Sequence, residues 1–328
     1  MTKNAVDVAV IGAGPAGLSA ALSASRENAS VLLIEREARP GGILKQCIHD
    51  GFGVIRYGER LSGPEYALRD IEALQKTTAK MELSTFATRI EKTDAGFLLT
   101  LVSKRGIAQT EARSLVLATG CRERTAKQAA IHGTQPAGVI TAGTAQYYIN
   151  IMGQMPARRC VILGSGDIGL IMARRLRLEG AEVEGVYEAK ETHSGLLRNV
   201  VQCLRDFEIP LHYCHTVTRV FGTGRVTAVE TSRVDGNMNP VRGTEKIVEC
   251  DALILSVGLI PENELAEALG ARMNLKTLGP VCGNDQMTTV KGVFCCGNAM
   301  RVTDLVDHVS SSGEAAGRNA AQHARRNE

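Results

Sequence analysis

Tryptophan is absent from this chain, and aromatic residues make up only 4% of it. Proteins that bind single-stranded nucleic acid without sequence preference stack the bases on aromatic side chains, so this composition disfavours such a function. The formal net charge is also small, +3 from 38 Lys and Arg against 35 Asp and Glu. A charge of this size gives little long-range attraction for a polyanion. We therefore expect no nucleic-acid partner.

Long apolar segments and paired cysteines are missing as well. No apolar run approaches the roughly 18 residues that a membrane-spanning helix needs, and residues 1–7 lack the apolar run of a secretory signal. The nine cysteines include no C-x-x-C pair, which favours free thiols in a reducing compartment over a disulfide framework. The seven histidines show no spacing typical of a metal site. We expect a cytoplasmic protein with no transmembrane segment and no metal.

Glycine, in contrast, is abundant, with 34 of 328 residues, and much of it falls in two similar segments. In the first segment, a β-branched run at 6–11 leads through a glycine-rich turn at 12–17 into a small-residue helix, and an apolar strand follows at 31–34. The same order returns at 160–163, 164–169, 167–179 and 182–187. Because each helix must cross over between parallel strands, the pattern predicts an α/β fold with two Rossmann-like dinucleotide-binding domains.

The first glycine-rich turn has the residues that a dinucleotide's pyrophosphate requires. Its cofactor-binding candidates are Gly12, Gly14, Pro15, Ala16 and Gly17. The first glycine permits a tight turn, the second lets the backbone approach the pyrophosphate, and the third lets the helix pack closely on the strand. Glu35 ends the next strand, 18 residues after Gly17 (35 − 17). This position predicts a carboxylate that accepts a hydrogen bond from a ribose hydroxyl.

The second turn repeats the arrangement. Its candidates are Gly164, Ser165, Gly166, Asp167 and Ile168. Glu188 follows Gly169 by 19 residues (188 − 169). The Glu188 carboxylate would repel the 2′-phosphate of NADP, so we expect NAD(H) rather than NADP(H), although the nearby Lys190 acts against this preference. Asp167, at the start of the helix, is interpreted as its N-cap.

Strand-rich segments follow both units. Residues 63–75 are predicted to form a helix, and residues 82–117 and 211–254 are each expected to form a β-meander whose last strand runs into glycine. A final strand at 293–295 and a helix from about residue 311 have no counterpart in the second half, and we expect them to complete the first domain. The predicted boundaries are 1–122 with 251–328 for the first domain and 123–250 for the second, which is inserted in it.

Further motifs give the chain a family resemblance. They are Gly41-Gly42, Ala118-Thr119-Gly120, residues 258–261 beginning with Gly258, and residues 292–298 ending with Gly297 and Asn298. With the two turns, they resemble the two-dinucleotide-binding-domain flavoproteins of the pyridine nucleotide–disulfide oxidoreductase superfamily, at the size of a thioredoxin reductase. The resemblance implies FAD at the first site, beside Glu35 and Arg36, and NAD(H) at the second. Asn298 stands where the family usually has Asp, and its amide still suits a hydroxyl or phosphate oxygen.

The redox disulfides of that superfamily have no counterpart in this sequence. No C-x-x-C occurs, and Cys47 is the only cysteine shortly after Gly42. Residues 41–53, 194–199 and 304–309, the last of which include Val306, resemble flavoprotein subunits of glycerol-3-phosphate, opine and amine dehydrogenase complexes. This narrower resemblance implies two partners, a small cysteine-rich protein and a second dehydrogenase subunit.

The function hypotheses follow from these motifs. Hydride transfer between bound cofactors needs no protein acid or base, so we name no firm catalytic residue. Cys47 and His49 are candidates for a thiol–imidazole pair, with packing near the flavin as the alternative. If residues 304–308 lie over the flavin, their amides would stabilise its reduced form.

The leading hypothesis is an FAD-dependent oxidoreductase that exchanges hydride with NAD(H) and electrons with a partner subunit. The alternatives are a free-standing NAD(P)H oxidase or small-acceptor reductase, and a non-catalytic dinucleotide-binding assembly subunit.

Overall fold

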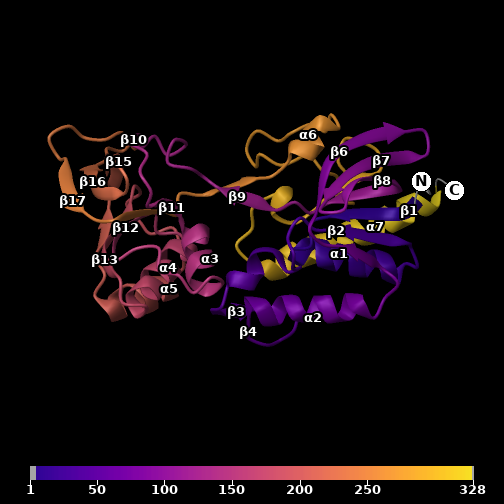
Figure 1. The fold of residues 1–328 in the computed structure, drawn as a ribbon, viewed down its shortest axis with the longest axis horizontal. Coiled ribbons are helices and arrows are strands. Elements are labelled where there is room, and N and C mark those ends of the chain that lie inside the picture. The colour runs from indigo at the N-terminus through magenta and orange to yellow at the C-terminus, as the bar shows by residue number, and fades with distance from the viewer. Residues whose placement is uncertain (1–4, 327–328) are drawn as a thin grey trace. The chain divides into compact units, whose positions relative to one another are not determined.

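The chain forms two compact units (Figure 1). The computed structural model describes residues 5–326. Residues 1–4, which belong to the segment expected to lack a secretory signal, lie outside the described residues. Unit 1 contains the chain up to Arg122 and again from Ile260, and unit 2 contains Glu123–Leu259. Each unit has the predicted Rossmann-like order of strand, glycine-rich turn, helix and strand.

The described part of unit 1 begins with β1, which leads into the first glycine-rich turn, and ends with helix α7. Up to the second unit its elements are β1 (Ala5–Ile11), α1 (Pro15–Arg26), β2 (Val31–Ile34), η1 (Gly42–Gln46), β3 (Asp50–Phe52), β4 (Leu61–Ser62), α2 (Gly63–Gln75), β5 (Lys80–Glu82), β6 (Thr85–Thr93), β7 (Gly96–Ser103) and β8 (Gly106–Leu117). The chain leaves through β9 (Cys121–Glu123) and returns through β19 (Leu259–Pro261), which pair with each other. The remaining elements are α6 (Glu264–Ala268), β20 (Val293–Cys295), η3 (Gly297–Ala299) and α7 (Val306–Arg326).

A seven-stranded sheet forms the centre of unit 1. β1 pairs in parallel with β2 and with the C-terminal half of β8, and β20 pairs in parallel with the end of β8. The N-terminal half of β8 pairs antiparallel with β7, which continues to β6. The predicted meander therefore shares its last strand with the parallel sheet, and β8 is one strand of 12 residues rather than a short one.

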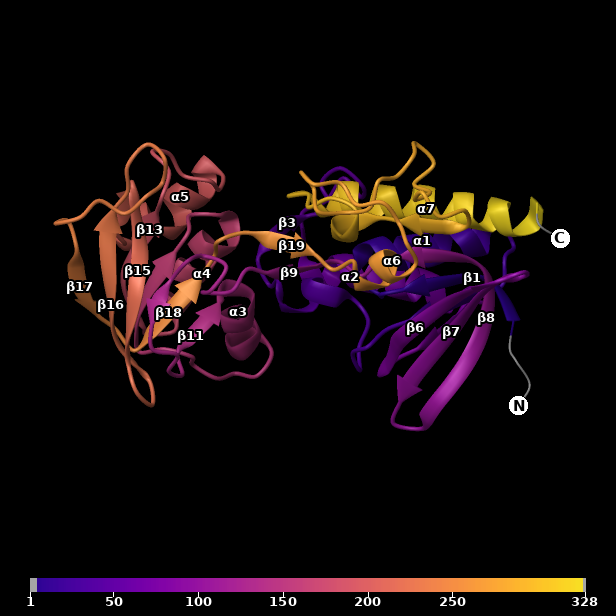
Figure 2. The same ribbon diagram turned by 90° about the horizontal axis from the view of Figure 1, so that it is seen from above.

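Helices α1 and α7 lie side by side in both views of the fold (Figure 1 and Figure 2). Gly313 and Gly317 of α7 face the backbone of α1. A Cβ added to them would lie 2.1 Å from the carbonyl oxygen of Ala16 and 2.0 Å from that of Ala20. Glycine at these two positions brings the helix backbones into contact, and this fixes α7 against the helix that begins at the first glycine-rich turn.

The last helix begins at Val306 and not near residue 311 as expected. Serine hydroxyls can compete with helical hydrogen bonds, but the run 310–312 lies inside this helix. Two of its hydroxyls have defined partners. Tyr66 donates its hydroxyl to Ser310 Oγ at 2.8 Å, and Ser312 Oγ donates to the carbonyl of Val309 at 2.8 Å. The serines are therefore compatible with a continuous helix.

Unit 2 repeats the first unit in a shorter form. Its elements are β10 (His132–Gly133), β11 (Val139–Thr141), α3 (Ala142–Asn150), β12 (Arg159–Leu163), α4 (Asp167–Leu178), β13 (Glu182–Glu188), α5 (Leu197–Cys203), η2 (Arg205–Phe207), β14 (Leu211–Tyr213), β15 (His215–Gly222), β16 (Val226–Arg233), β17 (Lys246–Glu249) and β18 (Ala252–Leu255).

The strands of unit 2 form two sheets, a parallel one in the order β11-β18-β12-β13-β14 and a second one in the order β10-β15-β16-β17. The strands expected at 211–254 are therefore divided between them. Strand β17 ends at Glu249, and after Cys250 and Asp251 the chain continues as β18, which pairs with β12 in the parallel sheet. Because β18 lies inside this sheet, unit 2 extends to Leu259, and the expected boundary after residue 250 lies too early.

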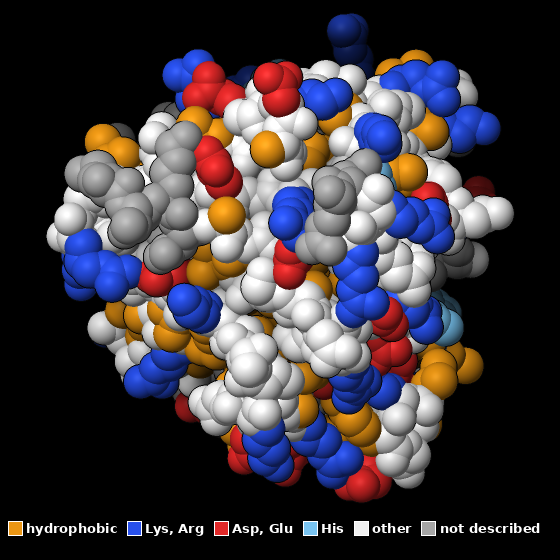
Figure 3. Space-filling model, turned by 90° about the vertical axis from the view of Figure 1, so that its right-hand side faces the viewer, with side chains coloured by type: hydrophobic (Ala, Val, Ile, Leu, Met, Phe, Trp, Pro, Cys, Tyr) orange, Lys and Arg blue, Asp and Glu red, His pale blue; other side chains and the backbone are white. Residues whose placement is uncertain are grey.

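None of the helices within residues 5–326 has the length and apolar composition needed to cross a bilayer. On the face shown in Figure 3, Lys and Arg side chains are interspersed with Asp and Glu. Opposite charges therefore neighbour one another on this side, in keeping with the small formal net charge of +3.

Candidate functional site

The first glycine-rich turn connects β1 to α1, and two of its glycines are required by close backbone contacts. Gly12 has a φ of +102°, and a Cβ there would lie 2.4 Å from the carbonyl oxygen of Ala118. A Cβ on Gly17 would lie 1.7 Å from the carbonyl oxygen of Gly12. Gly14 differs, because a Cβ there would meet only the Cα of Gly42, at 3.9 Å. The turn is thus packed against other backbone at Gly12 and Gly17 and has free space at Gly14, the N-cap of helix α1. The N-terminal amides of this helix favour an anion.

Glu35 is held against this turn at the end of β2. Its buried carboxylate accepts the backbone N–H of Ala13 at Oε2 (2.7 Å) and that of Glu37 at Oε1 (2.8 Å). A carboxylate has about four acceptor sites, so Glu35 retains capacity for a ligand hydroxyl. Arg36 is exposed and lies 3.4 Å from a carboxylate oxygen of Glu262. Of the two predicted residues, Glu35 therefore contacts the turn, whereas Arg36 contacts Glu262 in the segment that follows β19.

Gly41 and Gly42 return to the same turn. The backbone N–H of Gly41 donates to the carbonyl of Ala13 at 2.8 Å. Gly41 and Gly42 have φ values of +111° and +55°, and a Cβ on Gly42 would lie 2.8 Å from the Cα of Gly14. Both positions therefore need glycine, and the predicted Gly41-Gly42 motif lies beside the open part of the turn.

The Ala118-Thr119-Gly120 motif continues β8 and borders the turn. The N–H of Ala118 donates to the carbonyl of Ile11 at 2.9 Å. The hydroxyl of Thr119 donates to the backbone carbonyl of Glu262 at 2.6 Å. Gly120 has a φ of +76°. The motif therefore links the end of β8 to the turn and to the segment that returns from unit 2.

Gly297, Asn298 and the start of α7 follow β20. Gly297 donates its N–H to Ser312 Oγ at 2.8 Å. The amide of Asn298 is bound within the chain: Oδ1 accepts the N–H of Thr303 at 3.0 Å, and Nδ2 donates to the sulfur of Cys121 at 3.7 Å. Asn298 therefore stabilises its own loop, a role that the sequence did not predict.

Asp307 is a buried acid in the first turn of α7, next to the predicted Val306. It is 5% exposed, and its Oδ2 accepts the N–H of Ile55 at 3.2 Å. Its Oδ1 has no hydrogen-bond partner within residues 5–326. A buried polar oxygen without a partner is costly unless a ligand or water satisfies it. Together with the open space at Gly14, this oxygen fits a polar ligand with hydrogen-bond donors, as a flavin dinucleotide has.

Cys47 and His49 follow η1. The Cys47 thiol is buried and donates to the carbonyl of Ile43 at 3.3 Å. Burial raises the pKa of this thiol to about 12, which is the opposite of what an activated thiolate needs. The His49 ring lies 5.0 Å from the ring of Phe52. These features favour packing over a thiol–imidazole pair.

The second glycine-rich turn connects β12 to α4 and has the same geometry. Gly164 has a φ of +100°, and a Cβ there would lie 2.1 Å from the carbonyl oxygen of Ser256. A Cβ on Gly169 would lie 2.5 Å from the carbonyl oxygen of Gly164, whereas one on Gly166 would meet only Ser256 Oγ, at 3.5 Å. Ser256 thus occupies the position that Ala118 has in unit 1, and Gly166 is the open glycine.

Glu188 is the counterpart of Glu35, with more donors around it. Its Oε2 accepts the N–H of Ser165 (3.1 Å), the hydroxyl of Ser165 and the hydroxyl of Ser194 (3.2 Å). Within residues 5–326, its Oε1 accepts a single N–H, that of Lys190, at 3.1 Å. The ammonium of Lys190 donates to Ser194 Oγ at 3.2 Å. The carboxylate is therefore fixed in place, with one lone pair of Oε1 left for a ligand.

Asp167 is not the N-cap of α4, contrary to expectation. The N-cap is Gly166, and Asp167 is the first residue of the helix. Its Oδ1 accepts the N–H of Leu196 at 2.8 Å and the side-chain amide of Asn199 at 2.7 Å. Gly258, another predicted residue of this half, has a φ of +104°, and its carbonyl accepts the N–H of Arg124 at 3.0 Å.

Four residues around the second turn are missing from the predicted set, namely Ser194, Gly195, Asn199 and Ser256. A signal for them exists in the sequence. Residues 35–46 and 188–199 align without a gap, and Gly-Ile-Leu-Lys-Gln at 42–46 matches Gly-Leu-Leu-Arg-Asn at 195–199. In the same way, Leu-Ala-Thr-Gly at 117–120 matches Leu-Ser-Val-Gly at 255–258. The duplication is therefore longer than the two turns.

Comparisons with known proteins agree with this geometry. The family model described as "Pyridine nucleotide-disulphide oxidoreductase" matches residues 6–325. An opine oxidase subunit of Agrobacterium tumefaciens is 25% identical over 96% of this chain and 64% of its own length. The hydrogen cyanide synthase subunit HcnB of Pseudomonas aeruginosa is 28% identical over 80% of this chain and 58% of its own length. The chain thus spans less than two thirds of these relatives.

The solved structures include thioredoxin reductase from T. acidophilum. It superposes with a TM-score of 0.78 over 98% of this chain and 99% of its own, at 22% identity. This likeness establishes the fold.

Proposed function

Since the chain belongs to the pyridine nucleotide-disulphide oxidoreductase family and is accordingly a flavin-dependent oxidoreductase, we propose that unit 1 holds FAD and unit 2 holds NAD(H). In this proposal hydride passes between the two cofactors, and the electrons pass onward to a partner subunit.

One observation carries the proposal, namely that the same dinucleotide-binding arrangement occurs twice in one chain. In each unit a closed turn has an open second glycine, at Gly14 and at Gly166. In each unit a buried glutamate accepts a backbone N–H of that turn, Glu35 from Ala13 and Glu188 from Ser165. Two such sites in one polypeptide are what an enzyme needs to pair two dinucleotides.

FAD is assigned to unit 1 because this unit has features that unit 2 lacks among the described residues. The first turns of helix α7, which has 21 residues, lie near the start of α1, since a Cβ on Gly297 would lie 2.7 Å from Ala16 Cβ and 3.2 Å from Val309 Cγ1. A helix N-terminus stabilises negative charge. Asp307 contributes a buried carboxylate oxygen that has no partner in the described part of the chain, which suits a hydrogen-bond donor such as an imide N–H. The residues proposed to hold FAD are Gly12, Gly14, Pro15, Ala16, Gly17, Glu35, Arg36, Gly41, Gly42, Ala118, Thr119, Gly120, Gly297, Asn298 and Val306.

The second site is proposed to favour NAD(H) over NADP(H). Glu188 is fixed by the Ser165 and Ser194 hydroxyls and keeps one acceptor lone pair, which suits a ribose hydroxyl and repels a 2′-phosphate. The ammonium of Lys190 donates a hydrogen bond to Ser194 Oγ, whose hydroxyl in turn donates to Glu188. The residues proposed for this site are Gly164, Ser165, Gly166, Asp167, Ile168, Glu188 and Gly258.

The chain's own part in the reaction is to bind and orient. When bound, the flavin supplies the hydride-accepting chemistry, and the nicotinamide supplies the hydride. The two turns would hold the phosphates, and Glu35 and Glu188 would hold the riboses. The Cys47 thiol is buried and its pKa is raised by burial, so we do not propose it as a nucleophile. This agrees with the absence of a C-x-x-C pair from the sequence.

The partner is proposed to belong to the same oxidase or dehydrogenase complex. The relatives named above are subunits of an opine oxidase and a hydrogen cyanide synthase. The partner would supply the organic substrate site, for which an opine or another amine is the substrate class these names suggest. A glycerol-3-phosphate substrate and a small cysteine-rich partner remain proposals from the sequence resemblance.

Two matched variants test the assignment of the sites. Glu35→Ala should lower the FAD content of the purified protein, because the ribose acceptor of unit 1 is lost. Glu188→Ala should leave FAD in place and raise the Kd for NADH about tenfold or more, since hydrogen bonds to a charged group contribute roughly 1.5–3 kcal/mol each. It should also narrow the preference for NADH over NADPH. Normal FAD content in the first variant, or unchanged NADH binding in the second, would contradict the proposal.

A further inference from the structure

The two dinucleotide sites differ at the first residue of the helix that follows each turn. Helix α1 begins with Pro15, and helix α4 begins with Asp167. A segment returns over each turn, and we call residues 41–46 the first strap and residues 194–199 the second strap. The straps are anchored one position apart, because the N–H of Gly41 donates to Ala13 and that of Gly195, which matches Gly42, donates to Ser165, both at 2.8 Å. Pro15 and Asp167 nevertheless stand at the same place, directly after the second glycine of each turn.

In unit 2, Asp167 connects the strap to the helix. Its Oδ1 accepts the N–H of Leu196 at 2.8 Å and the side-chain amide of Asn199 at 2.7 Å. A Cβ on Gly195 would lie 2.7 Å from the same oxygen and 2.9 Å from the backbone nitrogen of Asp167. A carboxylate is thus held at the N-terminus of α4, between the helix and the strap.

Unit 1 has no acceptor at the equivalent place, because Pro15 has an apolar side chain. The ring carbon Cδ of Pro15 lies 3.9 Å from a Cβ placed on Gly42, so the first strap packs on α1 without a charged group between them. Ile43 is the residue of the first strap that matches Leu196, and Pro15 offers nothing to its N–H. The first site therefore presents its helix N-terminus to a ligand without a resident anion.

We propose that Asp167 makes the second site the weaker of the two, so that its nucleotide exchanges while the dinucleotide in unit 1 stays bound. Phosphates bind at helix N-termini through backbone N–H groups and the helix dipole. The Asp167 carboxylate already accepts the N–H of Leu196. Its negative charge offsets part of the positive potential at the N-terminus of α4 and would repel a pyrophosphate. This inference rests on the proposed function, since it assumes that unit 2 takes a dinucleotide.

A purely structural role for Asp167 makes a different prediction. If the carboxylate served only to hold the strap, its loss would loosen the site for every ligand. If it acts on the phosphates, its loss should tighten the binding of ligands that carry a pyrophosphate and leave the nucleoside unchanged. ADP and adenosine separate these cases, because they differ only in the phosphates.

The experiment measures Kd values of NADH, ADP and adenosine by calorimetry, on the FAD-loaded protein so that unit 1 is filled. Asp167→Asn keeps an acceptor for Leu196 and removes the charge, and Asp167→Pro copies the first turn. Asp206→Asn removes an exposed charge elsewhere in unit 2 and serves as the control. We expect both Asp167 variants to bind NADH and ADP about three- to tenfold more tightly, which is the effect of one unit charge a few ångströms away at a hydrated site.

Adenosine binding should be unchanged in both variants, and the control should match the wild type for all ligands. The proposal is overturned if ADP binding is unchanged or weaker in both Asp167 variants, or if adenosine tightens as much as ADP. A wild-type protein that binds neither NADH nor ADP would contradict the proposed function instead. In that case ADP binding by the Asp167 variants would still support the inference, and its absence would refute it.

Discussion

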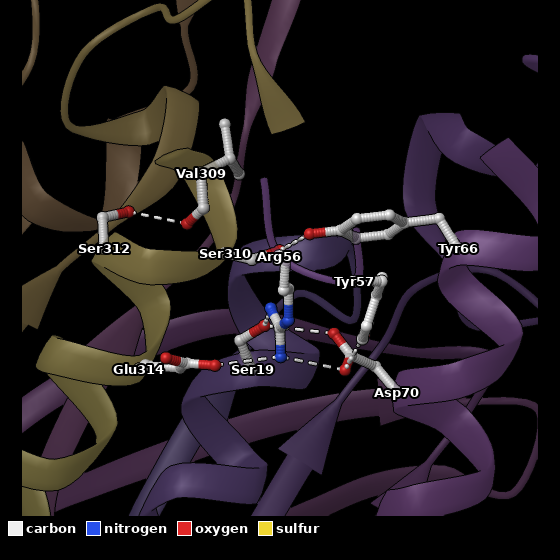
Figure 4. Close-up of polar contacts among 9 residues, drawn as sticks. All are labelled: Ser19, Arg56, Tyr57, Tyr66, Asp70, Val309, Ser310, Ser312 and Glu314. Carbon is white, nitrogen blue, oxygen red and sulfur yellow. Dashed lines mark hydrogen bonds and ion pairs between the residues drawn. The ribbon is translucent and has the colours of Figure 1, made fainter. Parts of the chain in front are cut away.

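Replacing Arg56 by Met should destabilise unit 1 in a pH-dependent way. The Arg56 guanidinium joins three elements (Figure 4): it donates to Ser19 Oγ of α1 at 2.7 Å, to Asp70 of α2 at 3.0 Å, and lies 3.0 Å from Glu314 of α7. Asp70 is only 3% exposed. Removal of Arg56 leaves this carboxylate without its cation, although Ser19 and Tyr57 still donate to it.

The size of the effect follows from the burial of Asp70. Breaking a buried ion pair by removing one partner costs about 3–5 kcal/mol. Because two neutral donors remain on Asp70, we expect a value at the lower end, about 3 kcal/mol at neutral pH. Arg69→Met is the matched control, since Arg69 pairs with Glu59 at the surface, where an exposed ion pair contributes little to stability.

The pH dependence has a definite sign. Burial raises the pKa of Asp70, while the Arg56 charge opposes that shift and lowers the pKa. Without Arg56 the folded-state pKa must rise further, so the variant takes up a proton that the unfolded chain does not. Its deficit in unfolding free energy should therefore be largest at high pH. It should shrink by up to about 1.4 kcal/mol per pH unit as the pH falls below the raised pKa.

Urea unfolding followed by circular dichroism from pH 5 to pH 8 measures this deficit. The double variant R56M/D70N should recover most of the lost stability at neutral pH, because it removes the uncompensated charge. A deficit that is below about 1 kcal/mol, or that stays constant over the pH range, would refute the reasoning.

The remaining predictions concern glycine contacts and thiol reactivity. Gly17→Ala should yield protein with little bound FAD by absorbance, because the new Cβ would lie 1.7 Å from the Gly12 carbonyl oxygen. Gly169→Ala should keep FAD and raise the KM for NADH, while Gly236→Ala, which has open space around it, should change neither. The pKa of Cys47 is raised to about 12 by burial, so iodoacetamide at pH 8 should label Cys47 only after unfolding; rapid labelling of the native protein would show that it is accessible.

The fold could be predicted from the sequence where the signal is local. The two strand–turn–helix–strand units, the helix over 63–75 and the hairpins of the first meander all lie where the pattern indicates, because glycine spacing and apolar periodicity determine them within short windows. Strand β8 and the break before β18 were not predictable in this way. Which sheet a strand joins depends on its neighbours, and those come from distant parts of the chain.

The site was predictable in part for the same reason. The glycines and Glu35 and Glu188 stand at fixed spacings along the chain. Asp167 looked like an N-cap because its contacts, Leu196 and Asn199, lie 29 and 32 residues away. The unpartnered oxygen of Asp307 required the fold, since its neighbour Ile55 is 252 residues away in the chain. Aligning residues 35–46 with 188–199 would have revealed the second strap.

The central claim is that a nicotinamide held by unit 2 reduces a flavin held by unit 1. An anaerobic titration of the purified FAD-loaded protein with NADH, and then with NADPH, tests it most directly. We predict that NADH bleaches the visible flavin band stoichiometrically, and that NADPH does so only at higher concentration. A colourless protein that takes up no FAD would contradict the account, as would a bound flavin that neither nucleotide reduces.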